Sequence, residues 1–298
     1  MNQQDISKTI KAGQIASQTK VYARTIVKKG VPLLEIAEKI ESKIVELGGK
    51  PAFPVNLSID NIAAHYTPSH DDKTLAHGLL KVDLGVHIGG FVADTAFSLD
   101  LENNEENKKL IKASEEALEK ALSLVKSKGI EVRLSEVGKV IQNTIESHGF
   151  SPVTNLSGHS IEKYNLHAGD TVPNIDNNGS SKFKEGIYAI EPFTTNGNGK
   201  VHDGAPSGIY ELVEERNTRS PIAREVLTFI QKEYETLPFC SRWIVKALGT
   251  KALFGLRELE SNGIIHQFTQ LVEAQGTKVS QAEQTILIEK GKVTVTSL

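Results

Sequence analysis

The chain has 298 residues, a formal net charge of −3 and a single cysteine, so it can bury a large core and cannot form an intrachain disulfide. The near-neutral charge gives no basic surface of the kind that binds nucleic acid or anionic membranes. No apolar run approaches the roughly 20 residues that span a bilayer and no signal segment is present, so we expect a cytoplasmic protein.

The first half of the chain predicts alternating helices and extended segments. In order, these are helices over 5–29 and 32–47, an extended segment over 51–68, a β-hairpin over 81–100, and helices over 104–128 and 135–148. We expect Ser135 to cap the last helix.

The second half predicts short helices between strands. The expected elements are a strand over 184–193, a loop over 195–207, helices over 221–237, 239–248 and 251–261, and strands from 263 onward. Glu191 lies in the first strand and Glu283 in the last run of strands. Because strands flank the helical block, we expect an insertion in a larger α+β domain.

The hairpin carries two carboxylates on one face. If its turn centres on Ile88-Gly89, Asp83 and Asp94 are directly opposite; if it centres on Gly89-Gly90, they are diagonal neighbours on the same face. Opposed ionised carboxylates about 5 Å apart repel each other, so this placement favours a cation between them. The ordinary alternative is that both side chains face water.

Apolar neighbours also surround three further residues whose side chains can bind a metal: His159, Glu191 and Glu283. A buried carboxylate must be neutralised, paired or metal-bound, and no Lys or Arg occupies a matching strand position. One imidazole and four carboxylates suit Mn, Co, Fe or Zn in a two-metal site.

Five motifs in this order resemble the type 2 methionine aminopeptidases of the M24 metallopeptidase family, in their short archaeal form. They are NIAAHYTP, KVDLGVHIGGFVADTAFS, LSGHSIEKYNLHAG, YAIEPFTTNGNGKV and QAEQTILIE. The resemblance spans nearly the whole chain. It implies an α+β pita-bread fold over 1–204 and 264–298, with a helical, winged-helix-like insertion over 205–263.

The resemblance also implies a reaction. The enzyme would remove the initiator methionine from peptides and nascent polypeptides when the second residue is small, with a hydroxide between two divalent ions (Co, Mn, Fe or Zn) attacking the carbonyl. Asp83 would bind one ion with both oxygens, Asp94 and Glu283 would bridge the ions, and His159 and Glu191 would complete the second site. Glu191 would also handle the proton of the hydroxide.

Other residues receive roles through the same resemblance. His65 and His167 would contact the scissile peptide and stabilise the tetrahedral intermediate. Phe53, Leu156 and Phe268 are candidates for the apolar methionine pocket, although core packing is the ordinary role of such residues. The family further implies a monomer that acts on nascent chains, with the ribosome as a candidate partner.

The last motif departs from the family. Ala282 stands where an aromatic residue is usual and Gln284 where a histidine is usual, which we interpret as tuning of the centre rather than its loss. The alternatives are an Xaa-Pro aminopeptidase or prolidase, and a catalytically impaired pita-bread relative that binds protein or RNA. A DNA-reading role for the helical block is disfavoured because acidic residues interrupt its basic ones.

Overall fold

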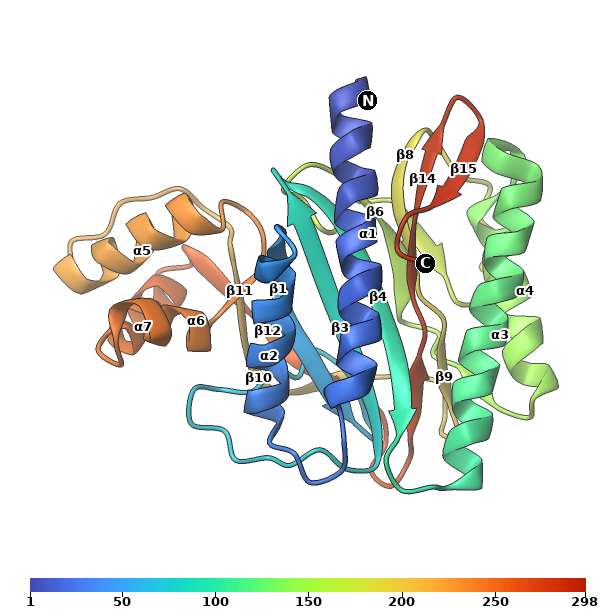
Figure 1. The fold of residues 1–298 in the computed structure, drawn as a ribbon, viewed down its shortest axis with the longest axis horizontal. Coiled ribbons are helices and arrows are strands. Elements are labelled where there is room, and N and C mark those ends of the chain that lie inside the picture. The colour runs from blue at the N-terminus through green and yellow to red at the C-terminus, as the bar shows by residue number, and fades with distance from the viewer.

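Two long helices cover one face of an antiparallel sheet in the computed structural model, which describes residues 1–298 (Figure 1). The elements of this first layer are α1 (Gln3–Ile26), α2 (Leu33–Glu46), β1 (Lys50–Ile59), β3 (Leu79–Ile88) and β4 (Phe91–Asp100). The sheet has the strand order β1-β3-β4, and both helices pack against it. The short strand β2 (Ile62–Ala64) follows β1 in the chain but belongs to another sheet.

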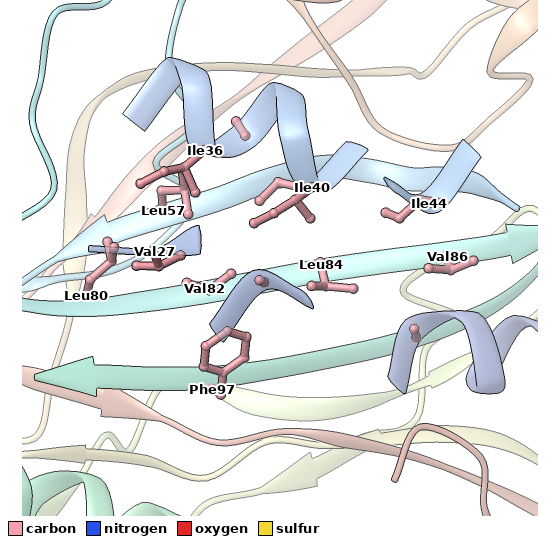
Figure 2. Packing of buried hydrophobic residues seen from close by; sticks show 14 of the residues in the cluster. Val27, Ile36, Ile40, Ile44, Leu57, Leu80, Val82, Leu84, Val86 and Phe97 are labelled. Carbon is pink, nitrogen blue, oxygen red and sulfur yellow. The ribbon is translucent and has the colours of Figure 1, made fainter. Parts of the chain in front are cut away.

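The core between α2 and this sheet follows from two periodicities. Ile36, Ile40 and Ile44 recur at helical spacing on α2, while Val82, Leu84 and Val86 alternate along one face of β3 (Figure 2). All are buried in one apolar cluster. Each such side chain stabilises the fold by about 1.5–3 kcal/mol relative to exposure.

A second layer of similar design follows in the chain. Its helices are α3 (Glu105–Lys128), the short 3₁₀ helix η1 (Gly129–Glu131) and α4 (Leu134–Ser147). Its strands are β5 (Ser151–Pro152), β6 (Ser157–Ile161), β7 (Thr171–Pro173), β8 (Gly186–Ile190), β9 (Phe193–Thr195), β13 (Val279–Gln281), β14 (Gln284–Glu289) and β15 (Lys292–Val295). They form two sheets, β15-β14-β8-β6-β7 and β13-β9-β5. The larger sheet packs with α3 and α4 around a second apolar cluster.

The remaining elements form a helical block beside the first layer (Figure 1). They are β10 (His202–Leu212), α5 (Pro221–Glu233), β11 (Phe239–Cys240), α6 (Ser241–Leu248), α7 (Ala252–Ser261) and β12 (Ile265–Val272). The three helices pack with β10–β12 around a cluster of their own. These strands and β2 form a sheet of order β11-β10-β12-β2. The expected boundary at 204/205 falls inside β10. The division into a pita-bread domain (1–204 and 264–298) and an insertion (205–263) therefore stays a prediction. No helix of the fold is both long and apolar enough to cross a membrane.

The register of the β3–β4 hairpin decides between the two expected turns. Asp83 pairs with Ala96 and Asp94 with Gly85, so the turn is Gly89-Gly90 and the two carboxylates are diagonal neighbours. Both turn glycines have positive φ, 56° and 86°, which suits glycine because it has no Cβ to clash.

The structure corrects other predictions. Ser135 does not cap α4; it lies inside the helix, where its hydroxyl donates to the carbonyl of Gly179 (2.7 Å). The segment over 195–207 is not all loop, because β10 begins at His202 and pairs with β12. Glu191 and Glu283 do not lie within strands but in the breaks between β8 and β9 and between β13 and β14.

A buried ion pair fastens the helical block to α2. Arg242, at the start of α6, donates two hydrogen bonds of 2.7 Å to the carboxylate of Glu41, and its Nε donates to the carbonyl of Pro68 (3.0 Å). Trp243 adds a third donor to Glu41 (2.9 Å). Glu41 is only 8% exposed and Arg242 only 2%, so each charge depends on the other.

We expect Arg242→Met to reduce the free energy of unfolding by about 3–5 kcal/mol, because it leaves the buried Glu41 carboxylate without its ionic partner. The same two helices offer a matched control in the exposed Lys246–Glu38 pair (3.6 Å), where Lys246→Met should change stability by less than about 1 kcal/mol. Denaturant titration followed by the fluorescence of Trp243, the single tryptophan, measures both. Equal losses in the two variants would contradict the prediction.

Candidate metal centre

All the predicted site residues line one cavity, which lies between the two layers and is bordered by the helical block. Its volume is about 220 Å³. The predicted residues that line it are Phe53, His65, Asp83, Asp94, Leu156, His159, His167, Glu191, Phe268 and Glu283. Residues far apart in the chain therefore meet in a single place.

The two hairpin carboxylates, Asp83 and Asp94, line this cavity. Asp94 is 4% exposed, and one oxygen of each carboxylate, Oδ1 of Asp83 and Oδ1 of Asp94, is buried without a hydrogen-bond partner. Buried polar atoms in native proteins are nearly always satisfied, so orphaned carboxylate oxygens indicate a missing ligand.

An imidazole and a third carboxylate close the group. His159, on β6, has its Nε2 3.8 Å from Oδ2 of Asp94 and 3.6 Å from Oε1 of Glu191. One ligand atom from each of Asp94, His159 and Glu283 lies within 4.8 Å of the others, and Oε2 of Glu283 is also a buried atom without a partner. This spacing fits a common cation.

The strand breaks put Glu191 and Glu283 into the cavity. β8 pairs with β14 up to Ile190↔Gln284, and β9 pairs with β13 from Phe193↔Gln281, so the two breaks face each other. Across them, the amide of Ala282 donates to the carbonyl of Pro192 (3.2 Å). The interruption frees both glutamates from the strict alternation of a continuous strand.

The electrostatics of the four carboxylates favour a cation. Burial raises the pKa of Asp83 to about 7. Burial first, and then the charges of neighbouring carboxylates, raise the pKa values of Asp94, Glu191 and Glu283 well above their ordinary range. Together with the orphaned oxygens, this donor set fits divalent cations that prefer oxygen and imidazole ligands.

Two further histidines border the carboxylate group. His65 has a left-handed backbone (φ 65°), and its Nδ1 is 3.1 Å from the carbonyl oxygen of Thr269. The ring of His167 lies edge-on to that of His159, with centroids 4.5 Å apart. Burial lowers the pKa of His65. Burial first, and then repulsion from a protonated His65, lowers the pKa of His167 to about 4. Both imidazoles are therefore neutral at pH 7.

The apolar wall of the cavity contains the three predicted aromatic and aliphatic residues and several others. Phe268 packs edge-on against His65, with centroids 5.6 Å apart. The prediction from sequence missed Ala64, Leu166, Phe193, Ile209, Pro238 and Leu271. Of these, Ala64 and Leu166 directly precede His65 and His167 in the motifs, which could have indicated them.

Polar residues were also missed: Asn155 and Ser157 line the cavity, and Asn56 and Gln281 lie beside the carboxylates. Asn56 pairs with Asp83 across β1 and β3, lines the cavity and has a buried Oδ1 without a partner. Gln281 donates from Nε2 to Oε2 of Glu191 (3.4 Å) and contacts the Asp83 carboxylate, whose pKa it lowers against the effect of burial. Its place two residues before Glu283 in the last motif was the available signal.

The chain is similar in sequence to known metallopeptidases. A sequence model of metallopeptidase family M24 matches residues 7–232. A methionine aminopeptidase of Pyrococcus horikoshii is 47% identical over 98% of this chain and 99% of its own length. Among solved structures, a thermophilic Arx1 has a TM-score of 0.82 at 16% identity, covering 99% of this chain and 91% of that one. A Thermotoga maritima methionine aminopeptidase has a TM-score of 0.69 at 21% identity, covering 100% and 98%.

We expect the metal-free protein to lose stability as the pH rises from about 4 to about 7. Asp83 binds its proton up to a pKa of about 7 when folded, against 3.8 ordinarily, so in this window the folded state holds more protons and rising pH favours unfolding. Asp83→Asn should therefore raise the melting temperature in chelator more at about pH 7.5 than at about pH 5.

The control for this experiment is Glu225→Gln, which neutralises an exposed carboxylate on α5. It should leave the pH dependence of melting unchanged. A parallel shift of the Asp83→Asn melting temperature at both pH values would contradict the buried, protonated state of Asp83.

Proposed function

Since the chain belongs to metallopeptidase family M24 and to its methionine aminopeptidases, with their pita-bread fold, we propose that it removes an N-terminal methionine when the second residue is small. The enzyme is a metallo-exopeptidase that uses a divalent metal. The observation that carries the proposal is that five potential ligands, from strands and strand breaks throughout the chain, line one cavity with orphaned oxygens.

Two divalent cations fit this donor set. Asp83 would be a ligand of one cation, His159 and Glu191 would be ligands of the other, and Asp94 and Glu283 would serve both. When bound, such cations polarise the scissile carbonyl and lower the pKa of water. Co, Mn, Fe and Zn all suit these ligands.

Glu191 is the residue we propose for proton transfer. Its carboxylate sits at the edge of the group, 3.6 Å from Nε2 of His159, and Gln281 orients its other oxygen. Without a cation, burial first and then the charge of Asp83 raise the pKa of Glu191. As a carboxylate at the edge of the centre it would accept a proton during attack and return it to the departing amine.

His65 and His167 would contact the scissile peptide and stabilise the tetrahedral intermediate, His167 as a neutral hydrogen-bond donor. A neutral imidazole whose pKa is held low donates to an oxyanion without releasing its proton. The contact of His65 Nδ1 with the carbonyl of Thr269 assigns the N–H to Nδ1 in the free protein, so Nε2 would need the proton for donation into the cavity. For His65 this role therefore requires a change of tautomer or protonation on substrate binding.

The apolar wall accounts for the proposed selectivity. Phe53, Leu156 and Phe268 would contact the unbranched methionine side chain, which buries well against aromatic rings. Ile209 and Pro238, from the helical block, border the same cavity and would crowd a large second residue. Nascent polypeptides are the proposed natural substrates; a ribosome contact and a monomeric state stay predictions.

We expect metal-stripped protein to release methionine from Met-Ala-Ser but not from Met-Lys-Ser after addition of Co(II), Mn(II), Fe(II) or Zn(II), each tested separately. Asp94→Ala should abolish release because it removes a bridging ligand, whereas Asp71→Ala, on an exposed loop, should not. Free methionine is measured by chromatography. No release with any metal from folded protein would favour the impaired binding module. In a third peptide, Ala-Pro-Ser, release of the first residue would favour the Xaa-Pro aminopeptidase.

We expect His167→Ala and His65→Ala each to lower kcat by about 10²–10³-fold, the usual effect of losing one donor to a developing oxyanion. KM should change much less, and the bound metal content should stay that of the parent. His202→Ala, at the exposed start of β10, is the control and should retain full kcat. A loss of metal together with activity would mean that these histidines act as ligands instead.

A further inference from the structure

The backbones that carry Asp94 and Glu283 are held from behind by three hydroxyl groups. The amide of Asp94 donates to Oγ1 of Thr285 (2.7 Å), and the same hydroxyl donates back to the Asp94 carbonyl (2.8 Å). Oγ1 of Thr95 donates to the carbonyl of Glu283 (2.9 Å). Thr95 and Thr285 are fully buried, so water does not replace these bonds.

Ser297 connects these groups. Its hydroxyl accepts from the amide of Thr285 (2.9 Å) and donates to Oε1 of Gln284 (2.9 Å), with the carbonyl of Asp94 at 3.4 Å. Ser297 is fully buried. Gln284, the residue that departs from the family motif, therefore has a partner in the last residues of the chain.

Helix α1 supplies a charge to the same network. Nζ of Lys20 donates to Oγ1 of Thr95 (3.2 Å) and to the carbonyl of Ser297 (3.0 Å). Burial, and then the charge of Arg24, lowers the pKa of Lys20 to about 8, while the Glu283 carboxylate acts in the opposite direction. The charge of Lys20, which does not line the cavity, thus acts on Glu283 from outside it.

The close fit of the chain end against α1 makes this contact possible. The end of the chain lies beside α1 and β14 (Figure 1), and the hydroxyl of Ser17 donates to the carbonyl of Leu298. A Cβ on Gly13 would lie 2.1 Å from the carbonyl oxygen of Thr296, so glycine is required for this approach. Ser17 belongs to the docking contact but makes no bond to the groups behind Asp94 and Glu283.

We propose that Ser297 and Lys20 are positioning residues of the metal centre, which hold the backbones at Asp94 and Glu283 so that the two bridging carboxylates keep the spacing that the cations require. The inference rests on the proposed metal centre. It goes beyond it by giving α1 and the end of the chain a role in metal affinity. Neither residue touches the cavity, so their effect passes through Thr95, Thr285 and Gln284.

The test is a titration of the metal-stripped protein with Mn(II), in which calorimetry measures the dissociation constant. We expect Ser297→Ala and Lys20→Met each to weaken Mn(II) binding by about 10-fold or more, the usual effect of losing a group that orients a metal ligand. Lys20→Arg should bind within about threefold of the parent, because it restores a donor and a charge. The visible spectrum of the Co(II) form should change in Ser297→Ala and Lys20→Met, since the ligand geometry changes.

Two matched controls separate this role from simple docking of the chain end. Ser17→Ala removes a docking hydrogen bond, and Lys11→Met removes an exposed charge from the same helix; both should bind Mn(II) as the parent does. Equal weakening in Ser17→Ala and Ser297→Ala would overturn the inference, as would parental binding by Ser297→Ala and Lys20→Met. Should Ser297→Ala not fold, as judged by circular dichroism, Lys20→Met and Lys20→Arg decide. A parent that binds no Mn(II) would overturn the proposed centre as well.

Discussion

Four carboxylates buried in one cavity are the constraint on which the rest of the site depends. Burial raises the pKa values of Asp83, Asp94, Glu191 and Glu283, and the charges of neighbouring carboxylates raise those of the last three further, so without a cation the carboxylates repel one another or retain protons. Such a group can persist only where the surrounding backbone is firmly held. Much of the fold around the cavity serves this purpose.

The backbone meets this demand in two ways. The hairpin places Asp83 and Asp94 diagonally, which keeps both side chains on one face. The facing breaks between β8 and β9 and between β13 and β14 then bring two glutamates into the cavity. Hydroxyl groups behind the strands satisfy the backbone atoms near these residues, so the carboxylates themselves are left free for a ligand.

The helical block closes the cavity on a third side, and a buried ion pair adds to the β2–β12 strand pairing and the apolar packing of Leu237 that attach it. Arg242 reaches Glu41 on α2 and the carbonyl of Pro68, close in the chain to His65. An ion pair has directional geometry, so it sets the orientation of the block in addition to its stability. The wall formed by Ile209 and Pro238 is held by the same attachment.

The sequence by itself determined the chemistry of this protein. The five motifs identified the family and the ligand candidates, and the α+β class and the main helices followed from composition and periodicity, because these are local properties of the chain. The hairpin was predicted too, although local pattern left its turn open between two registers. Side-chain alternation is nearly the same for both, so only the paired strand could decide.

The tertiary structure alone decided what depends on distant partners. The strand breaks at Glu191 and Glu283 arise from pairing between segments about 90 residues apart, as Gln281 and Glu191 are. The Glu41–Arg242 pair spans 201 positions, and the contact of Lys20 with Ser297 spans 277. No periodicity records such contacts, because each residue alone is an ordinary helix or loop residue. Its burial and its partner exist only after the chain has folded.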